Sequence, residues 1–227
     1  MSVDYRRPAW NSLTTTHRHL SEGGALARRY RPDVNLFASA RDDSEAALAA
    51  LGALFGPGET GFILQIPEIR LPPELEAVKT AQGVQMRLAD TPEAPDAADM
   101  VALTEADAPE MLALATLTEP GPFLDRTHEM ATFWGIRIDG RLAAMAGERM
   151  RFPGASEISG VCTHPDYRGQ GLARRLSAHV TQRVLARGDR PFLHAWADNH
   201  GAIRLYEGLG YRIECPVNVA VVTRRTP

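Results

Sequence analysis

One segment, residues 161–176, limits the fold more than any other part of the chain. An apolar, strand-like run is followed by a His-Pro-Asp turn and then by the loop Arg-Gly-Gln-Gly-Leu-Ala at residues 168–173. The apolar residues that follow the loop recur at helical spacing: Leu172, Leu176, Val180 and Val184. A helix start carries unsatisfied N–H groups and the positive end of the helix dipole, so it attracts anions. The segment therefore predicts a strand, a phosphate-binding loop and a helix.

Three kinds of phosphate loop can be compared with this pattern. A P-loop requires Gly-Lys-Ser/Thr at its end, and nothing of that kind follows Gly171. A dinucleotide-binding loop requires a third small residue three positions after the second glycine, but Arg174 stands there. The glycines still allow a ligand to approach the main chain, and Arg168 adds a charged fork. The sequence therefore fits neither of these two loops, and the third kind has to match the pattern Arg168-x-x-Gly171-x-Ala173.

A second segment, residues 193–212, carries an independent signal. It predicts a strand at 192–197, a helix that starts at Asp198-Asn199 and ends before Gly210, and a further strand from Tyr211. Asn199 and Tyr206 are seven positions apart, so two helical turns place both on one face.

Together these segments resemble the two signatures of GNAT-superfamily N-acetyltransferases. The loop at 168–173 resembles the Arg/Gln-x-x-Gly-x-Gly/Ala loop that binds the pyrophosphate of coenzyme A, and 199–211 resembles Asn-x-x-Ala-x-x-x-Tyr with a Leu-Gly-Tyr/Phe ending. The resemblance covers about residues 99–224 and is greatest to the branch that includes glycine N-acyltransferase-like proteins. It implies an α/β (α+β) fold with a mixed sheet and acetyl-CoA as co-substrate.

The chain is expected to divide at a segment rich in Pro, Ala and acidic residues. Residues 91–98 are predicted to be a linker between an N-terminal α/β region, 1–90, and a GNAT acetyltransferase domain, 99–227. Each part is expected to form its own mixed sheet. The N-terminal region either resembles half of a GNAT fold without its phosphate loop or is an unrelated capping domain.

Local patterns predict the elements of both parts. In the N-terminal region the expected elements are strands at 34–38, 61–66 and 84–88 and helices at 46–54 and 73–80. In the C-terminal part they are a strand at 100–104, a helix at 105–117, a helix or loop at 121–130, a hairpin of 133–138 and 142–150, and a strand at 157–163.

Composition narrows the classes of partner. A net charge of −3 argues against nucleic acid, because phosphate backbones require basic surface. No apolar run reaches membrane-spanning length, and the first residues lack the apolar core of a signal peptide. No further group of Cys, His or Asp residues accompanies His17 and His19, so a metal site is not expected. The two cysteines are expected to be reduced thiols rather than a disulfide. A cytoplasmic protein without metal, membrane or nucleic-acid partner is expected, and a homodimer stays open.

The resemblance implies how coenzyme A is held. Main-chain donors of the loop are expected to bind the pyrophosphate: Arg168, Gly169, Gln170, Gly171, Leu172 and Ala173. In GNAT proteins the strand before this loop splays from its neighbour, so amides of Val161, Cys162 and Thr163 are expected to meet the pantetheine arm and the thioester carbonyl. Asn199 is expected to bind that arm or the acceptor and also to cap its helix.

Acyl transfer to an amine also needs a base and an acid. Glu157 is the first candidate base. It lies eleven residues before Arg168, and the resemblance implies a base there, because this separation places the base carboxylate in the histone-modifying branch of the superfamily. Its apolar or small neighbours are also expected to raise its pKa. Glu148 is the second, with an ion pair to Arg149 as the competing interpretation, and Glu119 is expected to line the acceptor pocket. The alternative for Glu157 is an edge carboxylate that faces solvent.

Two further residues lie where the reacting groups are expected. Tyr206 is the candidate general acid, since a phenol with a pKa near 10 keeps its proton at pH 7. The thiol of Cys162 has no histidine at a fixed spacing and is expected to be inert packing rather than an acyl carrier.

These expectations combine into an acetyl-CoA-dependent N-acetyltransferase in which a primary amine, on a small molecule or a peptide, attacks the thioester directly in a ternary complex. The alternatives are an amino-acid N-acyltransferase that uses longer acyl-CoAs and a non-catalytic acyl-CoA sensor.

Overall fold

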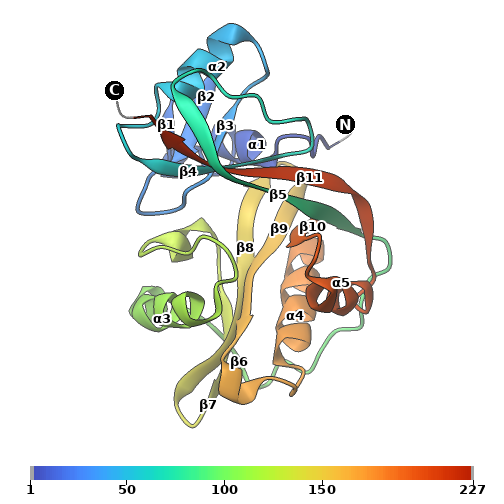
Figure 1. Ribbon diagram of the computed structural model, residues 1–227. Helices are drawn as coiled ribbons and strands as arrows, with labels where there is room; N and C mark the ends of the chain where they lie inside the picture. Colours follow the sequence, from blue (N-terminus) through green and yellow to red (C-terminus); the bar gives the residue numbers. More distant parts are fainter. Residues whose placement is uncertain (1–2, 226–227) are drawn as a thin grey trace.

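The computed structural model describes residues 3–225, and most of its strands join one mixed sheet of eight (Figure 1). The strand order is β4-β11-β5-β10-β9-β8-β7-β6. The bounds of these strands are β4 Thr60–Gln65, β5 Leu75–Leu88, β6 Met100–Ala102, β7 Trp134–Ile138, β8 Arg141–Phe152, β9 Ala155–Thr163, β10 Arg190–Trp196 and β11 Tyr211–Arg224. A small antiparallel sheet is formed by β1 Ser21–Gly23, β2 Ala27–Tyr30 and β3 Ala38–Ala40.

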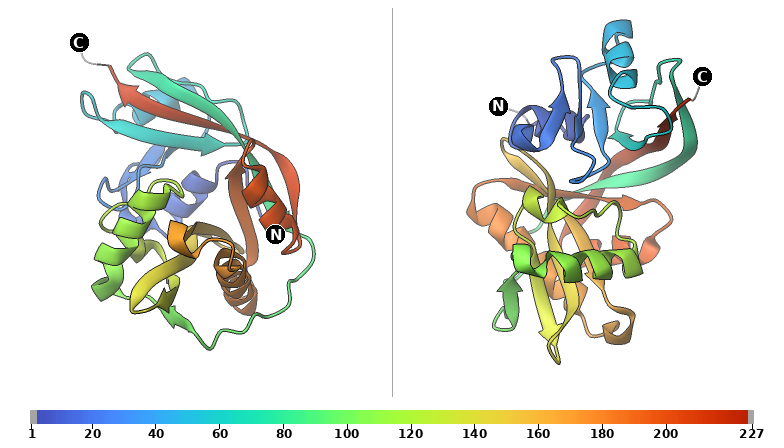
Figure 2. Two further views of the ribbon diagram at one scale, coloured as in Figure 1. Left: turned by 60° about the horizontal axis from the view of Figure 1, so that its bottom comes forward. Right: turned by 90° about the vertical axis from the view of Figure 1, so that its left-hand side faces the viewer.

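Helices cover both faces of the large sheet. They are α1 Pro8–Thr14, α2 Glu45–Gly52, α3 Ala108–Thr118, α4 Leu172–Ala186 and α5 His200–Glu207, with short 3₁₀ turns η1 Arg18–Leu20, η2 Glu105–Asp107, η3 Thr127–Met130 and η4 Pro165–Tyr167. Helix α3 packs against one side of β8 and β9 and α4 against the other, as the two views of Figure 2 show. The mixed α/β fold predicted from the sequence is confirmed.

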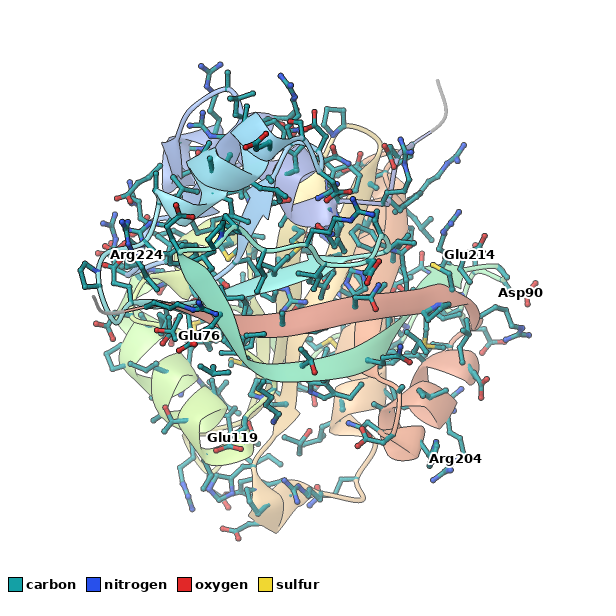
Figure 3. The ribbon with its side chains drawn as sticks, turned by 45° about the horizontal axis from the view of Figure 1, so that its top comes forward. Glu76, Asp90, Glu119, Arg204, Glu214 and Arg224 are labelled. Atoms are coloured by element: carbon teal, nitrogen blue, oxygen red, sulfur yellow. The ribbon has the colours of Figure 1, made fainter. Side chains whose placement is uncertain are left out.

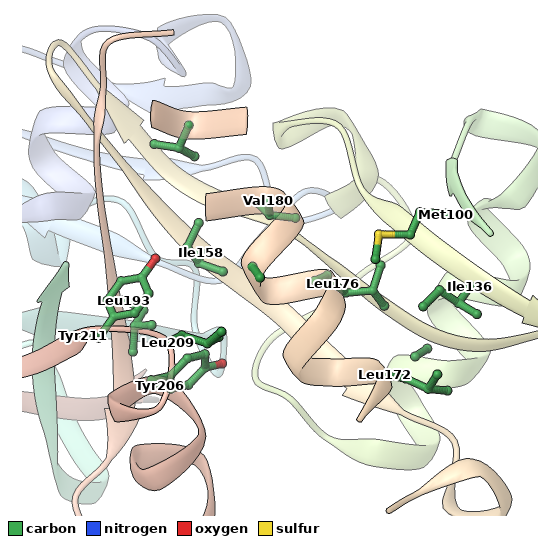
Figure 4. Close-up of a cluster of buried hydrophobic side chains, with 14 of the residues drawn as sticks. Met100, Ile136, Ile158, Leu172, Leu176, Val180, Leu193, Tyr206, Leu209 and Tyr211 are labelled. Atoms are coloured by element: carbon green, nitrogen blue, oxygen red, sulfur yellow. The ribbon is translucent and has the colours of Figure 1, made fainter. Parts of the chain in front are cut away.

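The apolar stripe of α4 forms the centre of the core on its side of the sheet. Leu172, Leu176, Val180 and Val184 are all buried, as their helical spacing predicts. Burying one such side chain contributes about 1.5–3 kcal/mol. Figure 4 shows Tyr206, Tyr211, Leu193 and Leu209 together at one end of this cluster, with Met100 and Ile136 towards the other.

The expectation of a separate sheet on each side of the linker is wrong. Strands β4 and β5, from the N-terminal region, pair with β10 and β11 of the C-terminal region inside the large sheet. The segment 91–97 between them carries no helix or strand. The N-terminal region therefore extends the same sheet, and its first part, with α1, α2 and the small sheet, packs as a cap at one end (Figure 1).

The helix predicted at 73–80 is also wrong, because β5 runs without interruption from Leu75 to Leu88. Its start, Leu-Glu-Ala-Val-Lys, contains good helix formers. The pairing of β5 with β11, from Leu75↔Arg224 to Leu88↔Tyr211, overrides this local preference. In addition, the strand expected at 34–38 lies at 38–40, and 121–130 is a loop that ends in η3.

No helix within residues 3–225 combines the length and apolarity that crossing a membrane requires.

Candidate active site

Two neighbouring strands part in the middle of the large sheet. Strands β9 and β10 are parallel, and their pairing runs only from Ala155↔Arg190 to Glu157↔Phe192. Beyond that point β9 pairs with β8, and β10 pairs with β5. In residues 158–163 of β9, the main-chain N–H and C=O groups that point towards β10 therefore have no partner strand among the described residues 3–225. Such groups are available to an extended ligand.

A glycine bulge bends β9 at this point. From Met145↔Cys162 to Gly147↔Ser159, β8 advances two residues and β9 three, and Gly160 lies within this shift with φ +61°. Bulges bend a strand and increase its twist. The ring of Phe133 packs on both glycines: a Cβ on Gly147 would lie 2.5 Å from it and a Cβ on Gly160 2.6 Å. The sequence around the bulge thus makes room for one aromatic ring and directs β9 away from β10.

The predicted phosphate loop lies at the end of β9. Gly169 (φ +80°) and Gly171 (φ +74°) adopt left-handed conformations that favour glycine, and a Cβ on either would point into open space. Gly171 is the N-cap of the fifteen-residue helix α4 and has no side chain to cap it. The first N–H groups of α4 are therefore left for another acceptor. The loop from Arg168 to Gly171 is exposed.

A pocket of about 160 Å³ opens where the strands part. Its lining brings together three of the predicted site residues, Val161, Asn199 and Tyr206. Glu119, Arg149 and His194 also line it. An adjoining pocket of about 550 Å³ shares part of this lining: Phe62, Glu119, Gly121, Pro122, Trp196 and Val219. The two pockets thus adjoin at residues of β4, β10, β11 and the loop that follows α3.

Tyr206 and Asn199 reach the small pocket from one helix. Asn199 is the N-cap of α5, and its Oδ1 accepts a hydrogen bond from the Ala202 N–H at 3.0 Å. Tyr206 is only 9% exposed, and burial raises its pKa above the ordinary value, with the negative charge of Glu157 adding to the effect. Within residues 3–225 its hydroxyl forms no hydrogen bond that would occupy it. It is a neutral phenol at the pocket wall.

Glu157 is not the activated carboxylate that the sequence suggested. It is 1% exposed, and burial alone would raise its pKa. The positive charge and hydrogen bonds of Arg149 and His194 outweigh this effect and lower its pKa to about 2. Arg149 contacts both carboxylate oxygens, and His194 Nδ1 lies 2.7 Å from Oε1. A carboxylate with this pKa and these partners is a weak base, and it does not face solvent as the alternative reading held.

The other two carboxylates occupy different environments. Glu148 is buried and forms its ion pair with Arg187, the C-cap of α4, Nη1 to Oε1 at 2.9 Å, rather than with Arg149. Glu119 ends α3 in a left-handed conformation (φ 49°), is exposed, and lines both pockets. Figure 3 shows it at the end of α3, beside the long strands that cross the molecule.

Cys162 contributes a buried thiol. Its residue is 6% exposed, and burial raises the pKa of the thiol to about 11. A thiol with this pKa remains protonated at neutral pH and is a poor nucleophile. Thr163, next in the strand, pairs with Ala144 of β8.

His17 is held inside the N-terminal cap. Its Nδ1 lies 3.0 Å from both the Ser12 and the Tyr30 hydroxyl, and burial lowers its pKa to about 4. Within residues 3–225 no three His, Cys, Asp or Glu side chains are grouped closely enough to hold one metal ion.

The sequence suggested Arg149 only as an ion-pair partner of Glu148, and it did not indicate His194 at all. Arg149 lies eight residues before Glu157 across the β8–β9 hairpin, and His194 lies on β10. The available signal was a charged residue within a strand that also carries Glu148 and Arg151, and such a residue does not identify its partner.

Comparison with known proteins agrees with this geometry. Residues 134–218, which contain β8, β9, the loop and α5, match the family model described as FR47-like protein. A crystal structure of a protein assigned to the GNAT family of acetyltransferases, from Novosphingobium aromaticivorans, is 41% identical. The match covers 97% of this chain and 98% of that one, with a TM-score of 0.91.

Two further relatives are more distant. The acetyltransferase SG1711 of Sodalis glossinidius is 39% identical over 62 residues, which are 27% of this chain and 42% of that protein. A GCN5-related N-acetyltransferase from Kribbella flavida shares the fold, with a TM-score of 0.61 at 20% identity over 96% of this chain and 95% of that one. From the match over nearly the whole length of the Novosphingobium protein, this chain belongs to the GNAT family and is an acetyltransferase.

Proposed function

We propose that the protein transfers an acetyl group from acetyl-CoA to a primary amine, by direct attack in a ternary complex. The observation that carries this proposal is the gap between β9 and β10, which leads from an uncapped helix start to a pocket lined by Tyr206. An elongated cofactor with a phosphate at one end and a thioester at the other fits such a path.

The residues present fit coenzyme A. N–H groups of 168–173 at the start of α4 would hold the pyrophosphate, because left-handed Gly169 and Gly171 leave that surface open. Within Val161, Cys162 and Thr163, the main-chain groups that point away from β8 would hold the pantetheine arm and polarise the carbonyl. Asn199 would contact the same arm from α5. The bound thioester supplies the activated acetyl group.

Glu119, rather than Glu157, is assigned as the general base. Glu157 is committed to Arg149 and His194, whereas Glu119 is exposed and borders both pockets. Glu119, directly or through a water molecule, accepts one proton from the acceptor ammonium, so that the amine can attack the carbonyl carbon. Glu157 keeps Arg149 and His194 in place in the pocket wall.

Tyr206 acts as the general acid. It donates its proton to the departing sulfur as the C–S bond breaks and the N–C bond forms, and it regains a proton from the nitrogen that becomes the amide. Its raised pKa keeps the phenol protonated at neutral pH, so a proton is available as negative charge develops on the sulfur, and the proton that it regains from the nitrogen prevents a free phenolate from remaining.

The N-terminal region supplies part of the acceptor side. Phe37 and Phe62 line the small pocket, and Leu36 and Lys79 line the large one. The described part of this region, residues 3–90, therefore completes both the sheet and the wall opposite the cofactor path. We propose this role in place of a self-contained first domain.

Two measurements test the function. Calorimetry should detect binding of acetyl-CoA and free coenzyme A to the folded protein, and a thiol-release assay over an amine panel should show turnover that needs an acceptor. Acetyl-, butyryl- and benzoyl-CoA compared with one acceptor would show the acyl preference. Absence of any coenzyme A binding by folded protein would overturn the proposal.

A further inference from the structure

One guanidinium nitrogen is left free at the buried end of the small pocket. Arg149 lines the pocket with a side chain that is 12% exposed. Its Nε and Nη2 donate to Glu157 at 2.9 and 2.6 Å. Within residues 3–225 its Nη1 donates to no oxygen at hydrogen-bond distance, and a Cβ built on Gly121 would lie 3.6 Å from it. A guanidinium has five N–H donors in a fixed plane, so donors remain for a ligand.

The surroundings fix this guanidinium in place. Glu157 holds one edge, and the ring of Phe37 lies against one face, with Cζ 4.6 Å from the ring centroid. His194 holds Glu157 from the other side. A planar cation fixed in this way, away from bulk water, suits a carboxylate better than it suits a neutral group.

The rest of the lining has a different character. The walls of the small pocket are largely apolar: Phe37, Phe62, Leu64, Ala202, Val217 and Val219. At the exposed end stands the carboxylate of Glu119. The pocket thus offers a buried cation, an exposed carboxylate and apolar walls beside them.

We infer that the acceptor is an amine that also carries a carboxylate, an α-amino acid with an apolar side chain, and that Arg149 Nη1 binds this carboxylate. The inference rests on the proposed function, because it names the acceptor of the same reaction. The ammonium group then faces Glu119, and the side chain contacts the apolar walls. Gly121 is part of the arrangement, since a side chain there would fill the space beside Nη1.

The test compares matched acceptors with the whole protein. Apolar L-amino acids, their carboxamides and the corresponding decarboxylated amines are assayed with acetyl-CoA, and kcat/KM is measured for each. We expect at least a tenfold preference for the free acids. Equal or faster turnover of the carboxamides and amines would overturn the inference, and so would turnover of none of the three classes by protein that binds coenzyme A.

A double variant, Arg149→Met with Glu157→Gln, removes both charges so that no unpaired ion is left in the core. It should bind coenzyme A as the natural protein does while its preference for acids falls towards one. Arg151→Met, on the same strand and 40% exposed, is the matched control and should keep the preference. A preference that survives the double variant contradicts the role of Arg149. If the natural protein itself did not bind coenzyme A, the proposed function would be overturned, and not only the role of Arg149.

Discussion

Arg149 and Glu157 face each other across the β8–β9 hairpin and form a two-point ion pair, Nε to Oε2 at 2.9 Å and Nη2 to Oε1 at 2.6 Å. Both side chains are nearly excluded from solvent, at 12% and 1% exposure. Removing one partner of such a pair leaves an uncompensated buried charge, which costs about 3–5 kcal/mol.

The variants Glu157→Gln and Glu119→Gln separate structural from catalytic carboxylates. Glu157→Gln should reduce the free energy of unfolding, because Arg149 loses its counter-charge, while kcat falls less than tenfold. Glu119→Gln lies at the surface and should leave stability within about 0.5 kcal/mol. Its kcat should fall at least tenfold, an effect in the range of a lost general base. Urea unfolding and steady-state kinetics on both variants decide between these roles, and the reverse pattern would restore Glu157 as the base.

Tyr206→Phe tests the general acid. We expect kcat to fall by at least an order of magnitude while the Kd for coenzyme A stays the same, because the hydroxyl acts on the leaving sulfur and not on cofactor binding. Tyr211→Phe is the matched control: its hydroxyl lies 2.7 Å from Thr181 Oγ1 in the same core cluster and away from the pocket. It should lose about 1 kcal/mol of stability and keep its turnover. Full activity of Tyr206→Phe with a saturating acceptor would rule out the assigned role.

The contribution of the bulge at Gly160 can be tested with variants of the two glycines and of Phe133, whose ring packs on both of them. Gly147→Ala should weaken coenzyme A binding and stability together, since its Cβ would lie 2.5 Å from the Phe133 ring. Phe133→Leu in the same chain removes that ring and should restore much of the loss. Gly160→Ala should not be rescued to the same degree, because φ +61° remains strained for alanine. Equal rescue of both glycine variants would show that ring contact alone, and not backbone conformation, matters.

A feature of the site could be predicted from the sequence only where the residues that form it lie close together in the chain. The loop at 168–173 and the pair Asn199 and Tyr206 depend on residues within one turn or one helix, so spacing revealed them. Glu157 depends on Arg149 and on His194, 37 positions away, and no periodicity records that contact. Apolar neighbours in the sequence suggested a raised pKa, but charged neighbours in space lower it.

The same reasoning explains the error in the N-terminal region. Residues 75–80 read as a helix because Glu, Ala and Lys favour one, yet β5 gains partners on both edges from β10 and β11. Those partners lie more than a hundred residues further along the chain. A strand whose stability comes from such distant pairing carries little signal in its own composition.

The buried His17 predicts how stability depends on pH. Burial lowers its pKa from 6.5 to about 4, so the folded state favours the neutral ring while the unfolded chain protonates near 6.5. Its stabilising effect is complete above pH 6.5 and is lost as pH falls towards 4, by an amount on the order of 3 kcal/mol. The effect of Glu157, with its pKa lowered from 4.5 to about 2, is lost only below pH 4.5. Urea unfolding between pH 7 and 4 measures the His17 window, to which His179, whose pKa burial also lowers, contributes as well. His17→Gln should flatten the slope there, and His200→Gln, at an exposed position, should not. An unchanged slope in His17→Gln would mean that another group sets the acid stability of this protein.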